Sequence, residues 1–170
     1  VHNEILRTRP DLLRVLYEPF HIDHRGEEPD GHEPFYPAPV FASHKGRFFA
    51  RFGQKYVESA QRYPQVPRMT DAQTEALDLF RDLALSDEFR LDMEFQPGDI
   101  QLLNNHLIVH RRTGYEDHKE PERRRHLVRM LLLTPGYRDL PAYAQHVNDF
   151  VTWWGDHPRQ SALADGEAGA

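Results

Sequence analysis

The sequence of 170 residues contains no cysteine. Without thiols, the chain forms no disulfide framework and carries out no thiolate chemistry. Any metal ion must therefore be bound by histidine, carboxylate or water.

Long apolar runs and excess positive charge are also absent. No stretch approaches the roughly 18 apolar residues of a membrane span, and no charged-then-apolar leader opens the chain, so we expect a cytoplasmic protein without a membrane partner. The 21 Lys and Arg residues are outnumbered by 27 Asp and Glu, and the net charge is −6. A broad nucleic-acid-binding face needs a basic surface, so we expect no nucleic-acid partner.

The length and the composition suit one globular domain. Hydrophobic residues make up 39% of the chain and charged residues 28%, which is ordinary for globular proteins. A chain of this size can bury a core of its own. We assign residues 1–157 to one domain and expect residues 158–170, which are rich in Ala and Gly, to form a disordered tail.

Capping residues and turn residues predict several short elements. A capping box formed by Thr70 and Gln73 predicts the longest helix, and Gly46 predicts the turn of a hairpin. A long loop is expected over 18–39, which contains five prolines, and an irregular aromatic segment after 134. The expected helices are 3–7, 10–16, 56–62 and 70–85, and the expected strands are 40–41, 47–52, 89–95, 100–103, 107–109 and 125–133.

The stretch from Pro97 to Thr134 contains the residues best suited to chemistry. His110 closes the apolar run Leu107–Val109, and a strand can aim such a histidine into a cavity as a metal ligand or general base. The same pattern also fits a structural histidine held by hydrogen bonds.

Arginines alternate with leucines on one face of the next expected strand. Arg125, Leu127 and Arg129 share that face because side chains of a strand alternate with period 2. A desolvated guanidinium is costly unless it meets an anion, and a carboxylate fits its planar fork. The alternative is a solvated run of arginines, which is the interpretation we favour for Arg123 and Arg124.

Three motifs of this stretch resemble the C-terminal signature of the taurine and 2,4-D dioxygenase (TauD/TfdA-like) family. They are Gly98–His106, His110–Asp117 and Arg125–Arg129, and the resemblance extends over roughly 1–141. Members of the family are Fe(II)- and 2-oxoglutarate-dependent oxygenases. The resemblance implies that His110 is the second histidine of a 2-His-1-carboxylate iron site and that Arg125 clamps 2-oxoglutarate. It also implies that Arg129 contributes to binding the cosubstrate or an anionic substrate.

The chain departs from the family pattern in one respect. The first two iron ligands of the family, a His-x-Asp/Glu pair, lie upstream of everything that this sequence matches. We therefore expect the C-terminal part of a longer enzyme, mainly β with flanking helices, whose double-stranded β-helix (jelly roll) is incomplete. Unpaired strand edges would then invite a homo-oligomer or a partner segment that supplies the missing strands.

His21 and Asp23 form a lookalike of the missing ligand pair. Residues i and i+2 of a strand project from one face and can chelate one ion. The pair lies in a hydrophilic segment, however, and the alternative is a solvated loop pair.

The expected function is an Fe(II)- and 2-oxoglutarate-dependent dioxygenase that uses dioxygen to hydroxylate or cleave a small organic substrate, for which an anion is one option. Two alternatives stay open from the sequence. One is a non-catalytic jelly-roll remnant or binding module without a complete iron site, and the other is a cupin-like metal protein without redox chemistry.

Overall fold

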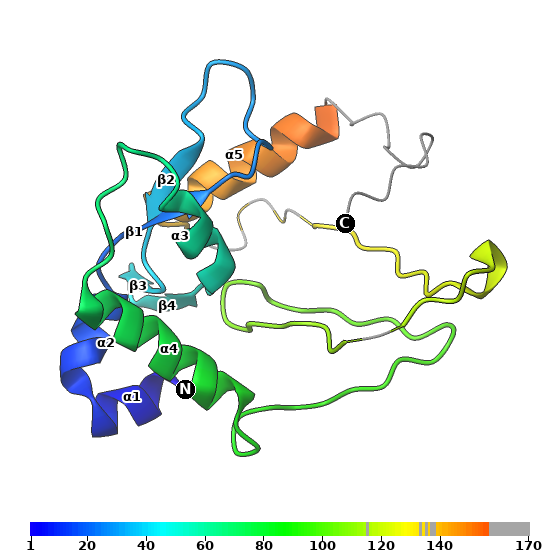
Figure 1. Ribbon diagram of the computed structural model, residues 1–170, viewed down its shortest axis with the longest axis horizontal. Helices are drawn as coiled ribbons and strands as arrows, with labels where there is room; N and C mark the ends of the chain where they lie inside the picture. Colours follow the sequence, from blue (N-terminus) through cyan, green and yellow to red (C-terminus); the bar gives the residue numbers. More distant parts are fainter. Residues whose placement is uncertain (115, 133, 135, 137–138, 157–170) are drawn as a thin grey trace. The chain divides into compact units, whose positions relative to one another are not determined.

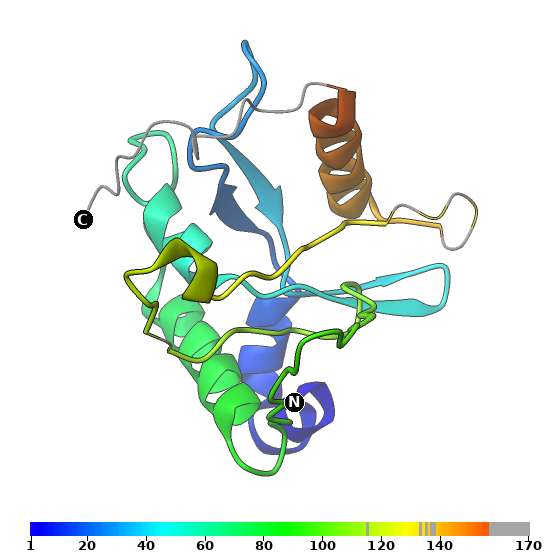
Figure 2. The same cartoon turned by 90° about the vertical axis from the view of Figure 1, so that its right-hand side faces the viewer.

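A computed structural model describes residues 1–114, 116–132, 134, 136 and 139–156. The chain divides into two compact units, Val1–Arg111 and Arg112–Ala170, and each is described by itself (Figures 1 and 2). In the described part of the chain, no helix is both long enough and apolar enough to cross a membrane.

Three helices form one side of the N-terminal unit. They are α1 (His2–Thr8), α2 (Pro10–Leu16), which has proline at its start, and α4 (Asp71–Leu85). The predicted capping box starts α4, because the Thr70 side chain accepts from the Gln73 amide at 3.2 Å and the Gln73 side chain accepts from the Thr70 amide at 3.0 Å. Helix α2 lies against α4 (Figure 1), and their apolar faces supply the buried Leu12, Leu13, Leu16, Ala76, Leu77 and Phe80.

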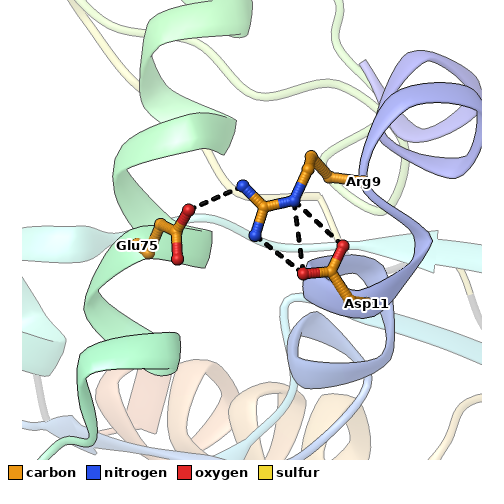
Figure 3. Close-up of polar contacts among 3 residues, drawn as sticks. All are labelled: Arg9, Asp11 and Glu75. Carbon is orange, nitrogen blue, oxygen red and sulfur yellow. Dashed lines mark hydrogen bonds and ion pairs between the residues drawn. The ribbon is translucent and has the colours of Figure 1, made fainter.

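One side chain joins these helices on the surface. The Arg9 guanidinium donates to Asp11 of α2, with Nε 3.0 Å from Oδ1 and Nη2 2.7 Å from Oδ2, and Nη1 is 2.6 Å from Oε1 of Glu75 in α4 (Figure 3). The hydrogen bonds from Arg9 lower the pKa of Asp11 to about 2. All three side chains are exposed to solvent, so salt screens this contact between α2 and α4.

The expected loop over 18–39 contains a hairpin, so that prediction was wrong. Strand β1 (Phe20–Asp23) pairs antiparallel with β2 (Phe35–Ala38), and Pro37 lies opposite His21. Proline lacks an amide donor, but a strand of a two-stranded sheet has one free edge that tolerates it. The many prolines and charges of the whole segment hid the two short strands, in which Phe20, Ile22, Asp23, Tyr36 and Ala38 are buried.

The second hairpin confirms its prediction. Strand β3 (Phe41–His44) pairs with β4 (Arg47–Ala50), and both turn residues, Lys45 and Gly46, have positive φ of 48° and 73°. Two such residues in succession match the twist of the flanking strands. Helix α3 (Gln54–Ala60) follows and lies against β1 (Figure 1). Stacking of Phe52 on Phe80, with ring centroids 4.2 Å apart, connects the chain after β4 to α4.

The predicted strands 89–95, 100–103 and 107–109 are not strands in the structure. After α4 the chain runs in an extended path without a ladder (Figures 1 and 2). Its apolar residues are exposed, with Leu91 at 83% and Ile100 at 87%. Alternating side chains set the two faces of a strand, but the strand forms only when a neighbouring segment pairs with its backbone. The described residues contain two separate two-stranded sheets, so a complete jelly roll is not formed within them.

In the C-terminal unit, the described residues form a 3₁₀ turn, η1 (Pro121–Arg123), and the helix α5 (Ala142–Asp156). Residues 125–132 are extended and exposed without forming the predicted strand, which is again a segment without a pairing partner. The prediction of an irregular segment after 134 was also wrong, because α5 lies within that segment. The signal for the helix was the spacing i, i+4, i+7 of Tyr143, Val147 and Phe150. The tail 158–170 lies outside the described residues, and the domain limits 1–157 stay a prediction.

Candidate functional site

His110 lies at the end of a segment that is anchored on the second hairpin. The His106 carbonyl accepts the Ala50 amide at 2.7 Å, and the His106 ring meets the Phe49 ring edge-on at 5.5 Å. Asn104 forms the preceding corner, because its side-chain oxygen accepts the His106 amide at 3.0 Å. The bond between Ala50 and His106 fixes the point where the segment leaves β4. His110 lies further along the segment, and its side chain is exposed.

Arg125 and Arg129 both lie in the extended, exposed part of the C-terminal unit. Asp117 holds the backbone of Arg125, since its Oδ1 accepts the Arg125 amide at 3.0 Å. The neighbouring Arg124 has its guanidinium engaged in the loop, where Nε and Nη2 donate to the carbonyls of His118 and Lys119 at 3.2 and 3.1 Å. Arg124 is exposed, as expected for a solvated run of arginines, and its guanidinium also holds the loop through these two bonds. The connecting Tyr115 lies outside the described residues.

Asp23 is a buried hub and not part of a solvated loop. Its side chain is 0% exposed. Oδ1 accepts from the Arg25 amide at 2.7 Å, and Oδ2 accepts from the Ser59 hydroxyl. Oδ1 also accepts from Arg62 Nη2 at 3.2 Å and from the Tyr63 hydroxyl at 3.1 Å. These bonds tie β1 to α3 and to the turn that follows α3.

The surroundings of Asp23 favour the ionised form of its carboxyl group. Burial raises the pKa of the carboxyl, but the hydrogen bonds from Ser59, Arg25 and Tyr63 and the charge of Arg62 outweigh it. The pKa of Asp23 therefore lies below its ordinary value. Sequence reasoning missed this hub, since only the strand at β1 reveals that Asp23 points inward.

The His21–Asp23 pair does not act as a ligand pair in this structure. Four donors occupy the two oxygens of Asp23, and the half-buried His21 has its ring beside Phe35, with centroids 5.5 Å apart. Within the described ranges, no three His, Asp or Glu side chains come together in a group that could hold a metal ion. A 2-His-1-carboxylate iron site needs such a group, so the described residues of this chain do not fit iron by themselves.

Comparison with known proteins decides the family. Residues 1–131 match the family described as Taurine catabolism dioxygenase TauD, TfdA family. The chain belongs to the TauD/TfdA dioxygenase family. The match includes the positions of His110, Arg125 and Arg129, whose individual roles stay predictions.

Two relatives of this TauD/TfdA chain show how much of such a protein it represents. It is 32% identical over 149 residues to FR-33289 synthase of Streptomyces rubellomurinus, covering 83% of this chain and 42% of that protein. It is 29% identical over 134 residues to the Taurine hydroxylase-like protein SAT17 of Stachybotrys chartarum, covering 77% of this chain and 33% of that protein. The chain thus spans less than half the length of either relative.

We predict that Asp23→Asn destabilises the N-terminal unit. The substitution replaces one carboxylate oxygen, which accepts hydrogen bonds, by an NH2 group that would face other donors. The free energy of unfolding at pH 7, measured with urea, should therefore fall by on the order of 3 kcal/mol. Because the folded pKa is depressed, the contribution of Asp23 is present above its ordinary pKa, about 3.9, and is lost as the pH falls through the folded value. The difference between the two proteins should therefore shrink below about pH 4.

The matched control is Asp30→Asn, which alters an exposed aspartate in the loop between β1 and β2 and should change stability by less than about 0.5 kcal/mol. Equal stability of Asp23→Asn and the unmodified chain at pH 7 would show that Asp23 is not the hub.

Proposed function

We propose that this chain is part of an Fe(II)- and 2-oxoglutarate-dependent dioxygenase that acts on a small organic substrate. The observation that carries the proposal is the family match over residues 1–131, which spans the motifs of His110 and Arg125. Both relatives are more than twice the length of the matched segment, so the proposed activity is that of a longer polypeptide.

His110 is the iron ligand that we assign to this chain. The anchor formed by His106 and Asn104 gives its segment a defined start on β4 and leaves the imidazole exposed to a partner segment. The other two ligands of the triad would come from elsewhere in the longer polypeptide, because the described residues supply no group of three. Fe(II) together with 2-oxoglutarate and dioxygen supplies the oxidising chemistry of the family.

Arg125 is the residue that we assign to the distal carboxylate of 2-oxoglutarate. A guanidinium binds a carboxylate through two parallel hydrogen bonds, and a lysine cannot reproduce that geometry. The bond from Asp117 to the Arg125 amide fixes the backbone from which the side chain departs. Arg129, two residues further along, would assist with the cosubstrate or with an anionic substrate.

The exposed extended segments fit a jelly roll that is completed by further strands. Leu91 and Met93 alternate with charged residues, and Ile100 and Leu102 alternate with polar ones, while all four are exposed. Such segments become strands when a neighbour pairs with their backbones and covers their apolar face. We propose that a segment of the longer polypeptide or another subunit supplies that neighbour.

The absence of a triad among the described residues favours one alternative, a remnant that has lost the iron site and keeps only a binding role. The two proposals differ in the coding sequence upstream. A coding segment with a His-x-Asp/Glu strand supports the enzyme, and its absence supports the remnant.

We predict that a longer polypeptide containing that strand consumes 2-oxoglutarate and that His110→Ala abolishes the reaction. Loss of one of three protein ligands should lower succinate release at least 100-fold, since binding of the metal depends on all of them. The matched control is His118→Ala, an exposed loop histidine, which should keep the unmodified rate. Equal rates for His110→Ala and the parent would remove His110 from the site.

We also predict that Arg125→Lys weakens the binding of 2-oxoglutarate by about 1–3 kcal/mol, because the charge remains and the bidentate fork is lost. The measurement is the apparent Kd of the cosubstrate in the same longer polypeptide. Arg124→Gln is the control, since Arg124 donates to loop carbonyls, and it should have little effect. Equal small effects at both positions would transfer the clamp role to Arg129.

A further inference from the structure

Two arginines of the N-terminal unit are stacked on tyrosines without a carboxylate partner. The Arg25 Cζ lies 4.3 Å from the centroid of the Tyr56 ring, and the Arg51 Cζ lies 5.2 Å from that of Tyr36. The ion pairs among the described residues involve neither arginine. Arg62 provides the contrast, because it stacks in the same way at 4.8 Å but also pairs with Asp23.

The two stacked pairs belong to one cluster around the buried Tyr36. Burial raises the pKa of the Tyr36 hydroxyl, Arg51 opposes this through its charge and a hydrogen bond, and the nearby Tyr56 adds to the rise. The His24 ring also packs against Tyr36, with centroids 4.6 Å apart. The cluster therefore brings two guanidinium groups and an imidazole to a surface formed by the ends of β1 and β4, by β2 and by α3.

This cluster adjoins the segment that carries His110. Arg51 directly follows Ala50, whose amide binds the His106 carbonyl at 2.7 Å. The Arg51 amide in turn donates to the Val40 carbonyl at 2.8 Å, which holds the backbone of Arg51 in place. Arg51 is thus fixed next to the point where the His110 segment leaves the hairpin.

The chemistry of a stacked guanidinium favours an anion at this surface. A guanidinium that lies over a ring still has N–H donors for other partners, and Arg51 keeps such donors beside the hydrogen bond that it makes to Tyr36. Arg51 is half-buried, and a partly desolvated cation without a counter-charge costs free energy that an anion would recover. The net charge of the chain is −6, so its overall electrostatic field does not attract anions. An anion at this surface would be bound by the nearby hydrogen-bond donors.

We propose that Arg25 and Arg51, positioned by Tyr56 and Tyr36, bind an oxyanion group of the substrate. The assignment to substrate rests on the proposed function, whereas anion binding itself requires neither iron nor 2-oxoglutarate. The ligand group is a carboxylate or a tetrahedral oxyanion, and both offer oxygens to guanidinium donors.

The experiment is an NMR titration of the 170-residue chain with sulfate, inorganic phosphate and acetate, each at constant ionic strength. At least one of these anions should shift the signals of Arg25, Arg51 and Tyr36 with a Kd on the order of millimolar. A stronger response to sulfate or phosphate identifies a tetrahedral group, and a stronger response to acetate identifies a carboxylate. No response to any of the three overturns the proposal.

Variants locate the site within the chain. Arg25→Gln and Arg51→Gln should each raise the Kd about tenfold, the scale of one charged hydrogen bond. Arg47→Gln removes the same charge from an exposed position on β4 and should leave the Kd unchanged. Arg25 is exposed, so its replacement tests the site even if Arg51→Gln fails to fold.

Two further outcomes would overturn the proposal. One is an equal rise in Kd for Arg47→Gln, which would mean that only overall charge matters. The other is loss of binding in Arg125→Gln with none in Arg51→Gln, which would place the anion at the proposed clamp. Neither outcome bears on the release of succinate by the longer polypeptide, so failure here and failure of the proposed function are distinguishable.

Discussion

The buried carboxylate of Asp23 is the interaction on which the N-terminal unit depends. It receives donors from the residues after β1, from α3 and from the turn after α3, and all of them lie within one small region around the end of β1. Because a buried charge must be fully paired, these elements can be placed together in only a few ways. The Asp23 carboxylate also accepts a hydrogen bond from the Arg25 backbone amide, so it helps to set the position of the proposed anion site.

The second constraint is that strands need neighbours. The hairpins β1–β2 and β3–β4 form because each strand pairs with the next strand along the chain. The segments around Leu91 and Ile100 carry an equally clear alternation, yet they are extended and exposed. Local sequence therefore predicted the capping box of α4 and the turn at Gly46, but it wrongly predicted strands over 89–95 and 100–103. It could not predict their pairing, because pairing depends on contacts between segments far apart in the chain.

The candidate site, too, could be predicted from the sequence only in part. The position of His110 after an apolar run and the alternation of Arg125 with Leu127 could be read from the sequence, and the family was identified from those motifs. The corner at Asn104 follows from local chemistry, because an Asn side chain commonly satisfies a neighbouring amide. The burial of Asp23 and the stacking of Arg51 on Tyr36 could not be predicted, since both depend on which elements meet in the folded unit.

Anaerobic titration of the 170-residue chain with Fe(II) in the presence of 2-oxoglutarate tests whether the described residues contribute His110 but not a complete iron site. One histidine cannot hold Fe(II) against water, so we expect no charge-transfer band and no binding tighter than about millimolar. A micromolar complex that disappears in His21→Ala would contradict the account, because it would show that His21 and Asp23 supply the ligand pair after all.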